Sequence, residues 1–459
     1  MTFARFALFF LVVPLAAPAA EIDWKQVGDE ATAMLRDYIR IDTSNPPGGE
    51  IAAARFFAEH FERAGIEHRI LESEPERASI IAWLPGRGDG KPIVLLNHLD
   101  TVPADPAAWS HPPHGAVVDE GYLYGRGALD CKGLAVMEAA AMIALARSGE
   151  RLGRDVIFLG TAEEETGGKL GAGWFAENHL ELLRGAEFMI NEGGHGRRLD
   201  DGALVYEVSP VEKTPLWLRL TAQGPAGHGS TPQGSPAVER LVRALEKVRT
   251  RVRDIRVTPE VDAYYKALAE RQPADLAARY RDLATALEDA SFRETFLGRP
   301  EDAALVQSTI SITVLQGSEK TNVVPPDAKA EIDCRLLPGE TPEQFLATLR
   351  ALIDDEDIDI EVLLSFPPAA SSTDTALYRA IERVAAAEGA AVVPVVLRGF
   401  TDSHYFRENG ITVYGFVPAI VTDTDVRRMH GIDERIPVAE LGPGTRRLVH
   451  ILRELDAPD

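Results

Sequence analysis

Gly125-Arg-Gly-Ala-Leu-Asp-Cys-Lys-Gly133 is the stretch around which this chain of 459 residues is organised. Within it, Asp130 stands between a glycine-rich approach and a run of helix-forming residues, 132–148. A carboxylate at such a junction can project into a cleft while the helix behind it holds it in place. Because an Asp before a helix is commonly only a cap, its role has to be judged from the rest of the chain.

Polar side chains also end three apolar segments, in the sequences Asn97-His-Leu-Asp100, Glu163-Glu-Glu165 and Asn191-Glu192. Continuous apolar runs are typical of strands buried on both faces of a parallel sheet, and ligands bind at the carboxyl ends of such strands. His98 and Asp100 point to the same side of an extended chain because they are two positions apart. Together with His430, these residues offer oxygen and imidazole ligands without thiolates, which predicts a pair of zinc ions.

Hydrophobic patterning divides the chain beyond its leader into three parts. Residues 21–210 and 367–459 combine helices with apolar strands, which predicts an α/β domain with a mixed, mostly parallel sheet. Residues 211–366 contain alternating strands in a β-α-β-β-α-β order, which predicts a small α+β domain inserted into the first. A charged helical stretch at about 251–304 is expected to elaborate this inserted domain.

The formal net charge of -23 at pH 7 argues against nucleic-acid binding. Residues 1–20 combine Arg5, a short apolar core and a small-residue cleavage site, after Ala19 or Ala20, which predicts a secretory signal peptide. An uncleaved anchor is the alternative, although the apolar run is short for a bilayer. We therefore expect an exported protein, periplasmic or secreted, without stable membrane insertion after cleavage. Cys131 and Cys334 form no disulfide framework and are expected to be small buried side chains.

The motifs in their order along the chain resemble the zinc-dependent amidohydrolase and exopeptidase family of aminoacylase, succinyl-diaminopimelate desuccinylase, glutamate carboxypeptidase, carnosinase and carboxypeptidase S. The resemblance rests on His98-Leu-Asp100, Gly125–Asp130, Glu164-Glu165, Glu192, Gly227-His-Gly-Ser230 and His430. It covers nearly the whole chain beyond the leader. Glu212-Lys213, the 224–232 motif and the 251–304 insert are most similar to the carboxypeptidase S and N-acyl-amino-acid hydrolase branch. The resemblance implies a catalytic α/β domain interrupted by a lid or dimerisation domain.

The resemblance also implies a ligand set. Asp130 would bridge two zinc ions, with His98 and Glu192 completing one site and Glu165 and His430 the other. Co²⁺ or Mn²⁺ could substitute for Zn²⁺.

Further roles follow from the same resemblance. Asp100 would orient the ring of the neighbouring histidine, and Glu164 would act as general base for attack of a water molecule on an amide carbonyl. Because Glu163 stands where the family has Asp, three consecutive glutamates permit a one-residue slip of these roles. A cis peptide between Asp130 and Cys131 is also implied.

Substrate-binding residues are implied in the inserted domain and in one later loop. His228 would stabilise the oxyanion, reaching the site across a dimer interface or after domain closure. Asn322 and Arg335 match positions that hold the substrate carboxylate, a task for which the guanidinium fork is suited. Gly399 and Thr401 belong to a Gly399-Phe-Thr-Asp402 loop that would line the pocket, with Phe400 in place of a glycine.

These assignments predict a metal-dependent hydrolase that cleaves an amide or peptide bond next to a free-carboxylate amino acid. The resemblance also allows a homodimer through the inserted domain, a contact that the 251–304 insert could alter or block. An N-acyl-amino-acid deacylase is the alternative, since both reactions cleave an amide near a carboxylate. A catalytically inactive binding homologue is disfavoured because every ligand and base position holds a competent residue. His111, His114, His195 and His404 are interpreted as structural.

Overall fold

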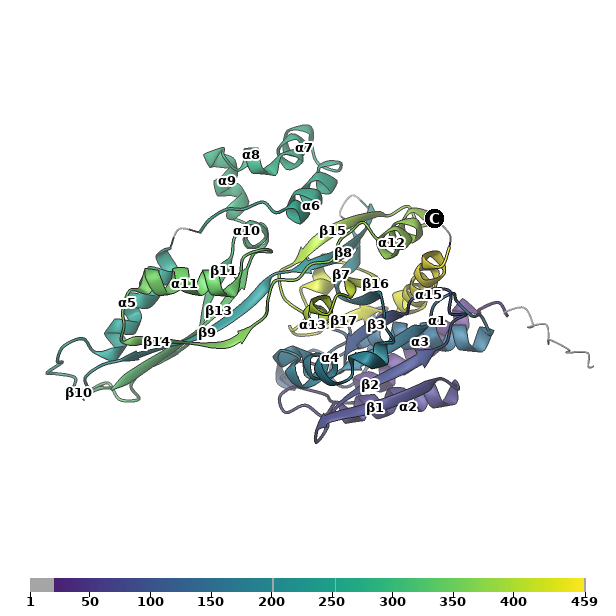
Figure 1. The fold of residues 1–459 in the computed structure, drawn as a ribbon, viewed down its shortest axis with the longest axis horizontal. Coiled ribbons are helices and arrows are strands. Elements are labelled where there is room, and N and C mark those ends of the chain that lie inside the picture. Colours follow the sequence, from purple (N-terminus) through teal and green to yellow (C-terminus); the bar gives the residue numbers. More distant parts are fainter. Residues whose placement is uncertain (1–19, 200–201, 252, 458–459) are drawn as a thin grey trace, which may run out of the picture.

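The computed structural model describes residues 20–199, 202–251 and 253–457, so the predicted signal peptide lies almost entirely outside the described residues. Figure 1 shows two sheets: a large one covered by helices, and a smaller one that extends away from it as an elongated arm. Within the described part of the chain, no helix is both long and apolar enough to cross a membrane.

The main sheet has eight strands in the order β1-β2-β6-β3-β7-β16-β8-β15. In chain order these are β1 (Glu67–Glu74), β2 (Arg77–Leu84), β3 (Ile93–His98), β6 (Val156–Thr161), β7 (Phe188–Arg198), β8 (Leu204–Glu212), β15 (Ala391–Leu397) and β16 (Thr412–Val421). β3 pairs in parallel with β6 and β7, and β7 pairs in parallel with β16. This mixed sheet with a parallel centre confirms the predicted α/β fold and brings the carboxyl ends of β3, β6 and β7 to one edge.

Helices cover both faces of the main sheet. One face buries the large core shared with α1 (Trp24–Ile39), α2 (Ile51–Arg63), α3 (Lys132–Ser148), α12 (Ala376–Ala387) and α15 (Val438–Leu455). The other packs against the short elements η3 (Lys169–Gly173), α4 (Trp174–Asn178), η4 (Leu180–Leu183) and α13 (Ser403–Glu408). The remaining short elements of this part are η1 (Pro106–Ala108), β4 (Val117–Asp119), β5 (Tyr122–Tyr124), η2 (Glu164–Thr166), α14 (Asp423–Val426) and β17 (Arg435–Pro437). Burial on both faces explains why the central strands are continuously apolar.

The arm, which we call the inserted unit, is a four-stranded antiparallel sheet in the order β11-β13-β9-β14. Its elements are β9 (Thr214–Gln223), β10 (Gly227–His228), α5 (Ala237–Thr250), β11 (Thr309–Gln316), β12 (Val323–Val324), β13 (Asp327–Leu336), α11 (Pro342–Ile353) and β14 (Ile358–Ser365). Alternate residues of β9 and β13 are buried against the two helices, because strand side chains point to opposite faces in turn.

Five helices, here called the insertion helices, interrupt the inserted unit between α5 and β11: α6 (Pro259–Ala269), α7 (Ala274–Arg281), α8 (Leu283–Ala286), α9 (Ala290–Leu297) and α10 (Pro300–Val306). Their hydrophobic cluster also contains Val211 of β8 and Val396 of β15. Lys213 donates hydrogen bonds of 2.9 Å to the carbonyl oxygens of Ala304 and Gln307 at the end of α10. The insertion helices are therefore anchored on the edge of the main sheet, although we expected them to elaborate the inserted domain.

The sequence analysis did not identify β16, a central strand. Its sequence contains Gly415 and Pro418, which normally mark turns or edges. A Cβ at position 415 would lie 2.4 Å from the carbonyl oxygen of Glu192, so this close passage against β7 requires glycine. The pairing of the two strands is also irregular around these residues.

Candidate metal and catalytic site

The metal-ligand candidates converge from five parts of the chain. His98 is the last residue of β3, Glu165 lies in the turn after β6, and Glu192 lies on β7. Asp130 precedes α3, and His430 follows α14. Parallel pairing of β3, β6 and β7 brings the first three together. Glu192 lies inside β7, which continues to Arg198, although the sequence pattern placed it at the end of a strand.

Asp130 lies at the centre of this cluster and presents one carboxylate oxygen to each of two histidines. Its Oδ1 is 3.0 Å from His98 Nε2, and its Oδ2 is 3.0 Å from His430 Nε2. Glu192 Oε1 lies 3.4 Å from the first histidine, and Glu165 Oε2 lies 3.1 Å from the second. Each oxygen of the Asp130 carboxylate thus faces a separate pair made of one histidine and one glutamate. This is the arrangement expected of a ligand that bridges two metal ions.

The electrostatics of the cluster fit a cationic ligand. Burial, followed by the charge of Asp130, raises the pKa of Glu192 to about 7 and also raises that of Glu165. Hydrogen bonds to Asp130 and Glu165 raise the pKa of His430 to about 11. The carboxylates and imidazoles thus lie within one cluster in which negative charge is concentrated. Divalent cations would replace protons in such a cluster and compensate the same negative charge.

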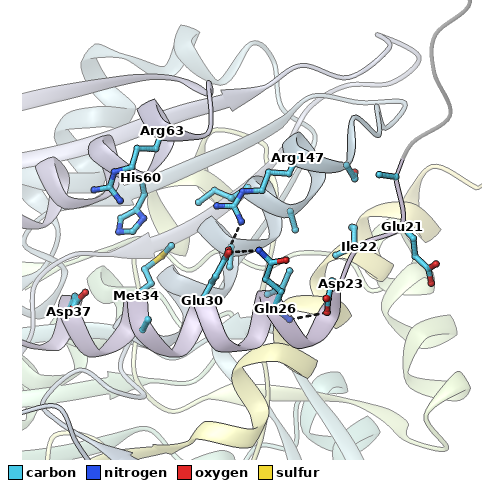
Figure 2. Close-up of a pocket in the computed structure, with 17 residues that line it drawn as sticks. Glu21, Ile22, Asp23, Gln26, Glu30, Met34, Asp37, His60, Arg63 and Arg147 are labelled. Atoms are coloured by element: carbon cyan, nitrogen blue, oxygen red, sulfur yellow. Dashed lines mark hydrogen bonds and ion pairs between the residues drawn. The ribbon is translucent and has the colours of Figure 1, made fainter.

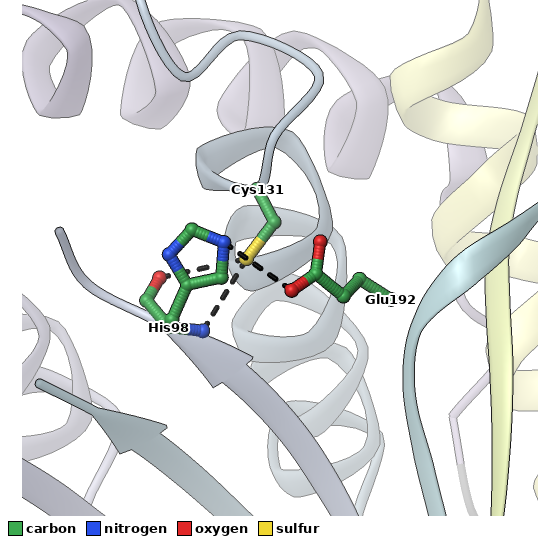
Figure 3. A group of neighbouring side chains, drawn as sticks. All are labelled: His98, Cys131 and Glu192. Carbon is green, nitrogen blue, oxygen red and sulfur yellow. Dashed lines mark hydrogen bonds and ion pairs between the residues drawn. The ribbon is translucent and has the colours of Figure 1, made fainter. Parts of the chain in front are cut away.

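Cys131 lies beside His98 and Glu192, close enough for the three to be considered as metal ligands (Figure 3). Its Sγ accepts a hydrogen bond of 3.3 Å from the His98 amide and donates one of 3.5 Å to the His98 carbonyl. Burial raises the pKa of the thiol well above its usual value, which favours the neutral form. Cys131 is thus a buried thiol that holds the end of β3, and the peptide bond that precedes it is cis, as predicted.

Asp100 contacts both the ring of His98 and the turn that carries Glu164 and Glu165. The Nδ1 of His98 lies 3.0 Å from the Asp100 carbonyl oxygen and 3.4 Å from its carboxylate. The same carboxylate accepts hydrogen bonds from the amides of Glu164 and Glu165, at 3.1 and 3.2 Å, and from Asn45 Nδ2 at 2.8 Å. Asp100 therefore positions the glutamate turn as well as the histidine ring.

The three consecutive glutamates have different environments. The Glu163 carboxylate accepts hydrogen bonds from Thr166 Oγ1 in its own turn and from Leu170 N in η3. Glu165 contacts His430, whereas Glu164 is 8% exposed, and burial followed by the charge of Glu192 raises its pKa well above the usual range. Glu165, and not Glu164, thus contacts His430 and belongs to the group of metal-ligand candidates.

Glu434 is a positioning residue that the sequence analysis missed. Its carboxylate is fully buried, forms an ion pair of 2.7 Å with Arg126, and accepts backbone hydrogen bonds of 2.9 to 3.0 Å from Gly127, Leu129 and Asp130. It therefore fixes the loop that carries the central carboxylate. Its position four residues after His430 was the only signal in the sequence.

The predicted substrate-binding residues are divided between two places. His228 and Asn322 adjoin one another around the β10–β12 pairing, where Gly229 N donates to the Asn322 carbonyl at 2.8 Å. Figure 1 places β10 at the end of the inserted unit farthest from the main sheet. His228 is exposed, and its Nδ1 lies 2.8 Å from Ser230 Oγ. A single chain in this arrangement does not bring His228 to Asp130.

The other predicted substrate residues lie where the inserted unit joins the main sheet. Arg335 forms a bidentate pair with Asp333, at 2.8 and 3.1 Å, and lies over the ring of Phe400. The Thr401 hydroxyl is buried and donates to Glu212 at 2.7 Å. Gly399 has open space where a side chain would be. Arg335 and Thr401 already have internal partners, so only Gly399 is unobstructed in this arrangement.

The histidines interpreted as structural have local contacts. His111 and His114 lie 3.5 Å from Asp119 and Asp42. His404 is buried, stacks on Phe366, and has its Nδ1 2.8 Å from the Thr401 carbonyl oxygen. His195 is buried, and its Nε2 has no hydrogen-bond partner among the described residues.

A separate cavity of about 400 Å³ lies between α1, α2 and α3 (Figure 2). Its lining includes Gln26, Glu30, His60 and Arg147. All of the predicted site residues lie elsewhere, so this cavity is distinct from the metal-ligand cluster.

The chain is similar to several known proteins. The sequence profile of Peptidase family M20/M25/M40 matches residues 94–454. N-fatty-acyl-amino acid synthase/hydrolase PM20D1 of Xenopus tropicalis is 29% identical over 75% of this chain and 69% of its own length. Human aminoacylase-1 is 26% identical over 88% of this chain and 90% of its own. Probable carboxypeptidase S-like 2 of Dictyostelium discoideum is 25% identical over 76% of this chain and 68% of its own length.

The fold is also similar to solved structures. The M20 family metallo-carboxypeptidase Sso-CP2 from Sulfolobus solfataricus aligns with a TM-score of 0.74, covering 93% of this chain and 99% of that one at 20% identity.

Proposed function

This chain belongs to Peptidase family M20/M25/M40, and on that premise we propose that it is a di-zinc hydrolase of an amide bond next to a free-carboxylate amino acid. The observation that carries the proposal is the central carboxylate of Asp130, with one oxygen 3.0 Å from His98 and the other 3.0 Å from His430. Two cations held by Asp130 with His98, Glu192, Glu165 and His430 would supply Lewis acidity to the scissile carbonyl and would lower the pKa of a nearby water molecule.

The protein's own groups perform the proton transfers. Glu164 is buried beside the cluster with a raised pKa, which suits a group that must take a proton from water and return it to the leaving amine. Asp100 and Glu434 hold the two loops that carry the reacting and ligating side chains. His228 would donate to the developing oxyanion, and its distance from Asp130 within one chain favours delivery by a partner subunit or by closure of the inserted unit.

For the substrate, we propose two candidates that share the reaction. Carboxypeptidase S-like relatives favour a peptide with a free carboxylate, whereas the aminoacylase and N-fatty-acyl-amino acid relatives favour an N-acyl amino acid. We further propose export from the cytoplasm through residues 1–20, and a lid or dimerisation role for residues 211–366.

The test is hydrolysis of two matched panels, dipeptides and N-acyl amino acids, by the mature protein before and after chelation and zinc restoration. We expect cleavage that needs metal and disappears in Glu164→Gln, with the preferred panel identifying the substrate. Absence of bound metal together with absence of turnover would refute the proposal. Two bound metals without turnover would refute only these substrate classes.

A further inference from the structure

A cavity of about 260 Å³ lies in the inserted unit. It is enclosed by the end of α5, the segment that links α5 to α6, the start of β11, and the turn between β13 and α11. Its lining includes Arg251, Arg253 and Arg256, and we call it the arginine pocket. Among the described residues that line it, none is a metal-ligand candidate, so the pocket lies outside the proposed active site.

The three arginines have no carboxylate partner. Within residues 20–199, 202–251 and 253–457, no ion pair joins any of them to an acidic side chain. Acidic partners are plentiful in this chain, which has 71 Asp and Glu against 48 Lys and Arg. Arg256 instead donates a hydrogen bond of 2.8 Å to the Pro338 carbonyl oxygen. The positive charges that line the pocket are therefore not compensated by ion pairs.

Two acidic residues also line the pocket, Glu340 and Asp254. Glu340 accepts a hydrogen bond from the Ser308 hydroxyl, which in turn accepts one of 3.0 Å from the Leu337 amide. Asp254 is exposed to solvent. Three positive and two negative side chains give the lining a net charge of +1, whereas the whole chain carries -23. The pocket is thus a cationic region on an acidic protein.

One guanidinium nitrogen of the pocket is buried without an acceptor. Arg251 is half-buried, and its Nη1 has no hydrogen-bond partner among the described residues. Its guanidinium lies over the ring of Phe345, 5.1 Å from the ring centre, and that ring is itself buried. A buried charged donor without a partner costs free energy, which a bound acceptor would recover. An anion satisfies both the hydrogen bond and the charge.

Hydrogen bonds hold the backbone that carries the arginines. The Arg256 amide donates to the Val306 carbonyl oxygen at 2.8 Å. The Gln307 side-chain amide donates to the Arg253 carbonyl oxygen at 3.2 Å. The arginine side chains therefore start from a fixed backbone, which lowers the entropy cost of gathering them around a ligand.

The size and chemistry of the pocket indicate a small anion. Its volume is below the range of about 300–1,000 Å³ that is typical of sites for drug-sized ligands. Guanidinium groups form paired hydrogen bonds with phosphate and carboxylate oxygens. Three guanidiniums around one small space favour a ligand with more than one negative charge. A phosphate group fits, because it carries a charge of about −1.5 to −2 at pH 7 and three acceptor oxygens.

We propose that the arginine pocket binds a phosphate group, as free phosphate or as a small phosphomonoester. This site goes beyond the proposed hydrolysis and does not depend on it. The alternative is that water alone hydrates the three guanidiniums.

The test is isothermal titration of inorganic phosphate, at low salt, into the metal-loaded wild type freed of excess zinc. Arg251→Met should weaken binding by about 10- to 100-fold, because a charge-assisted contact is lost. Arg253→Met at an exposed position should act in the same direction without disturbing the fold. Arg249→Met is the matched control, since its guanidinium is paired with Glu246 at 2.9 Å outside the pocket.

Two further arms identify the site and the ligand. Asp130→Asn should retain phosphate binding, which separates the arginine pocket from phosphate held at the metals. Titration with glycerol phosphate decides the source: tighter binding than inorganic phosphate indicates a phosphomonoester, and weaker binding indicates the free ion.

Thermal unfolding provides a second readout that needs no hydrolysis. Phosphate should raise the Tm of wild type and Arg249→Met, and should raise that of the arginine-pocket variants much less. A loss of binding in either folded arginine-pocket variant, with the control unchanged, supports the site whether or not any amide is hydrolysed. Absence of phosphate binding to the folded wild type, equal binding by both arginine-pocket variants, or loss of binding in Asp130→Asn would overturn the proposal.

Discussion

Glu434 and Asp130 are joined by a hydrogen bond of 3.0 Å from the Asp130 amide to the Glu434 carboxylate, although 304 positions separate them in the sequence. The bond ties the loop before α3 to the segment that follows His430. The buried Glu434 carboxylate therefore fixes the loop that carries Asp130 to the segment that follows His430.

Substitution Glu434→Gln should weaken metal binding about 10- to 100-fold, because outer partners orient the ligands. It should also destabilise the fold by about 3–5 kcal/mol, since Arg126 would lose its buried partner. Equilibrium dialysis against zinc and thermal unfolding measure the two effects. Glu150→Gln, which breaks a peripheral pair with Arg453, serves as the control. Unchanged zinc affinity in a folded Glu434→Gln protein would contradict a positioning role.

Replacing Glu164 by Gln should lower kcat by about 10²- to 10⁴-fold while both metals stay bound, because the substitution removes a proton acceptor and no proposed ligand. Glu163→Gln is the adjacent control and should retain most of the activity, since its carboxylate bonds to Thr166 and Leu170 and to none of the ligand candidates. Metal content and rate are measured on the same samples. A large loss of activity in Glu163→Gln together with a small loss in Glu164→Gln would mean that Glu163 holds the general-base role.

Chelation should abolish hydrolysis and lower Tm, because cations that bind only the folded state stabilise it by about 2.7 kcal/mol at one hundred times their Kd. Zinc should restore both properties, and Co²⁺ or Mn²⁺ should restore activity to different extents. The same treatment of an Asp130→Asn protein should change Tm much less. A chelated protein that keeps full activity would exclude metal dependence.

His228→Ala should lower kcat strongly and leave metal content unchanged, because the imidazole is proposed to meet the oxyanion from another subunit or after closure. Co-expression of His228→Ala and Glu164→Gln chains distinguishes the two routes. Recovered activity in the mixed protein indicates delivery by the partner subunit. If the two chains are shown to associate and the mixed protein is still inactive, the result indicates that the inserted unit closes over the site within one chain.

Stability should depend on pH through Lys213. Burial, and then the charge of Arg335, lowers the pKa of this amine to about 7, whereas it is about 10.4 in an unfolded chain. Between these values the unfolded state binds more protons, so the free energy of unfolding should rise with pH by up to about 5 kcal/mol.

The measurement for Lys213 is the difference in unfolding free energy between wild type and Lys213→Met from pH 6.5 to 9.5. The difference should grow toward high pH, in favour of the wild type. Lys247→Met controls for the loss of a lysine-to-carbonyl hydrogen bond, here 2.6 Å to Ile353. A difference that is constant with pH would contradict the lowered pKa.

Local patterning was sufficient for much of the fold. Apolar runs ending in polar residues located β3, β6 and the start of β7, and strand alternation located β9 and β13. It failed for β16, whose internal Gly415 and Pro418 resemble turn signals. The close passage against β7 requires Gly415, and Pro418 lies where the pairing with β7 is irregular. The requirement for glycine at position 415 comes from a neighbouring strand, so it cannot be recognised from the residues next to it in the sequence.

The sequence by itself predicted the α/β class and the ligand candidates, because apolar runs and residue types are local properties. It also predicted that His98, Glu165 and Glu192 lie close together, because parallel pairing brings neighbouring strands side by side. Only the tertiary structure decided that Asp130 offers separate oxygens to His98 and His430, that Glu434 holds its loop, and that the insertion helices pack against β15. These relationships depend on contacts between residues hundreds of positions apart, and their geometry is set by packing of the whole chain.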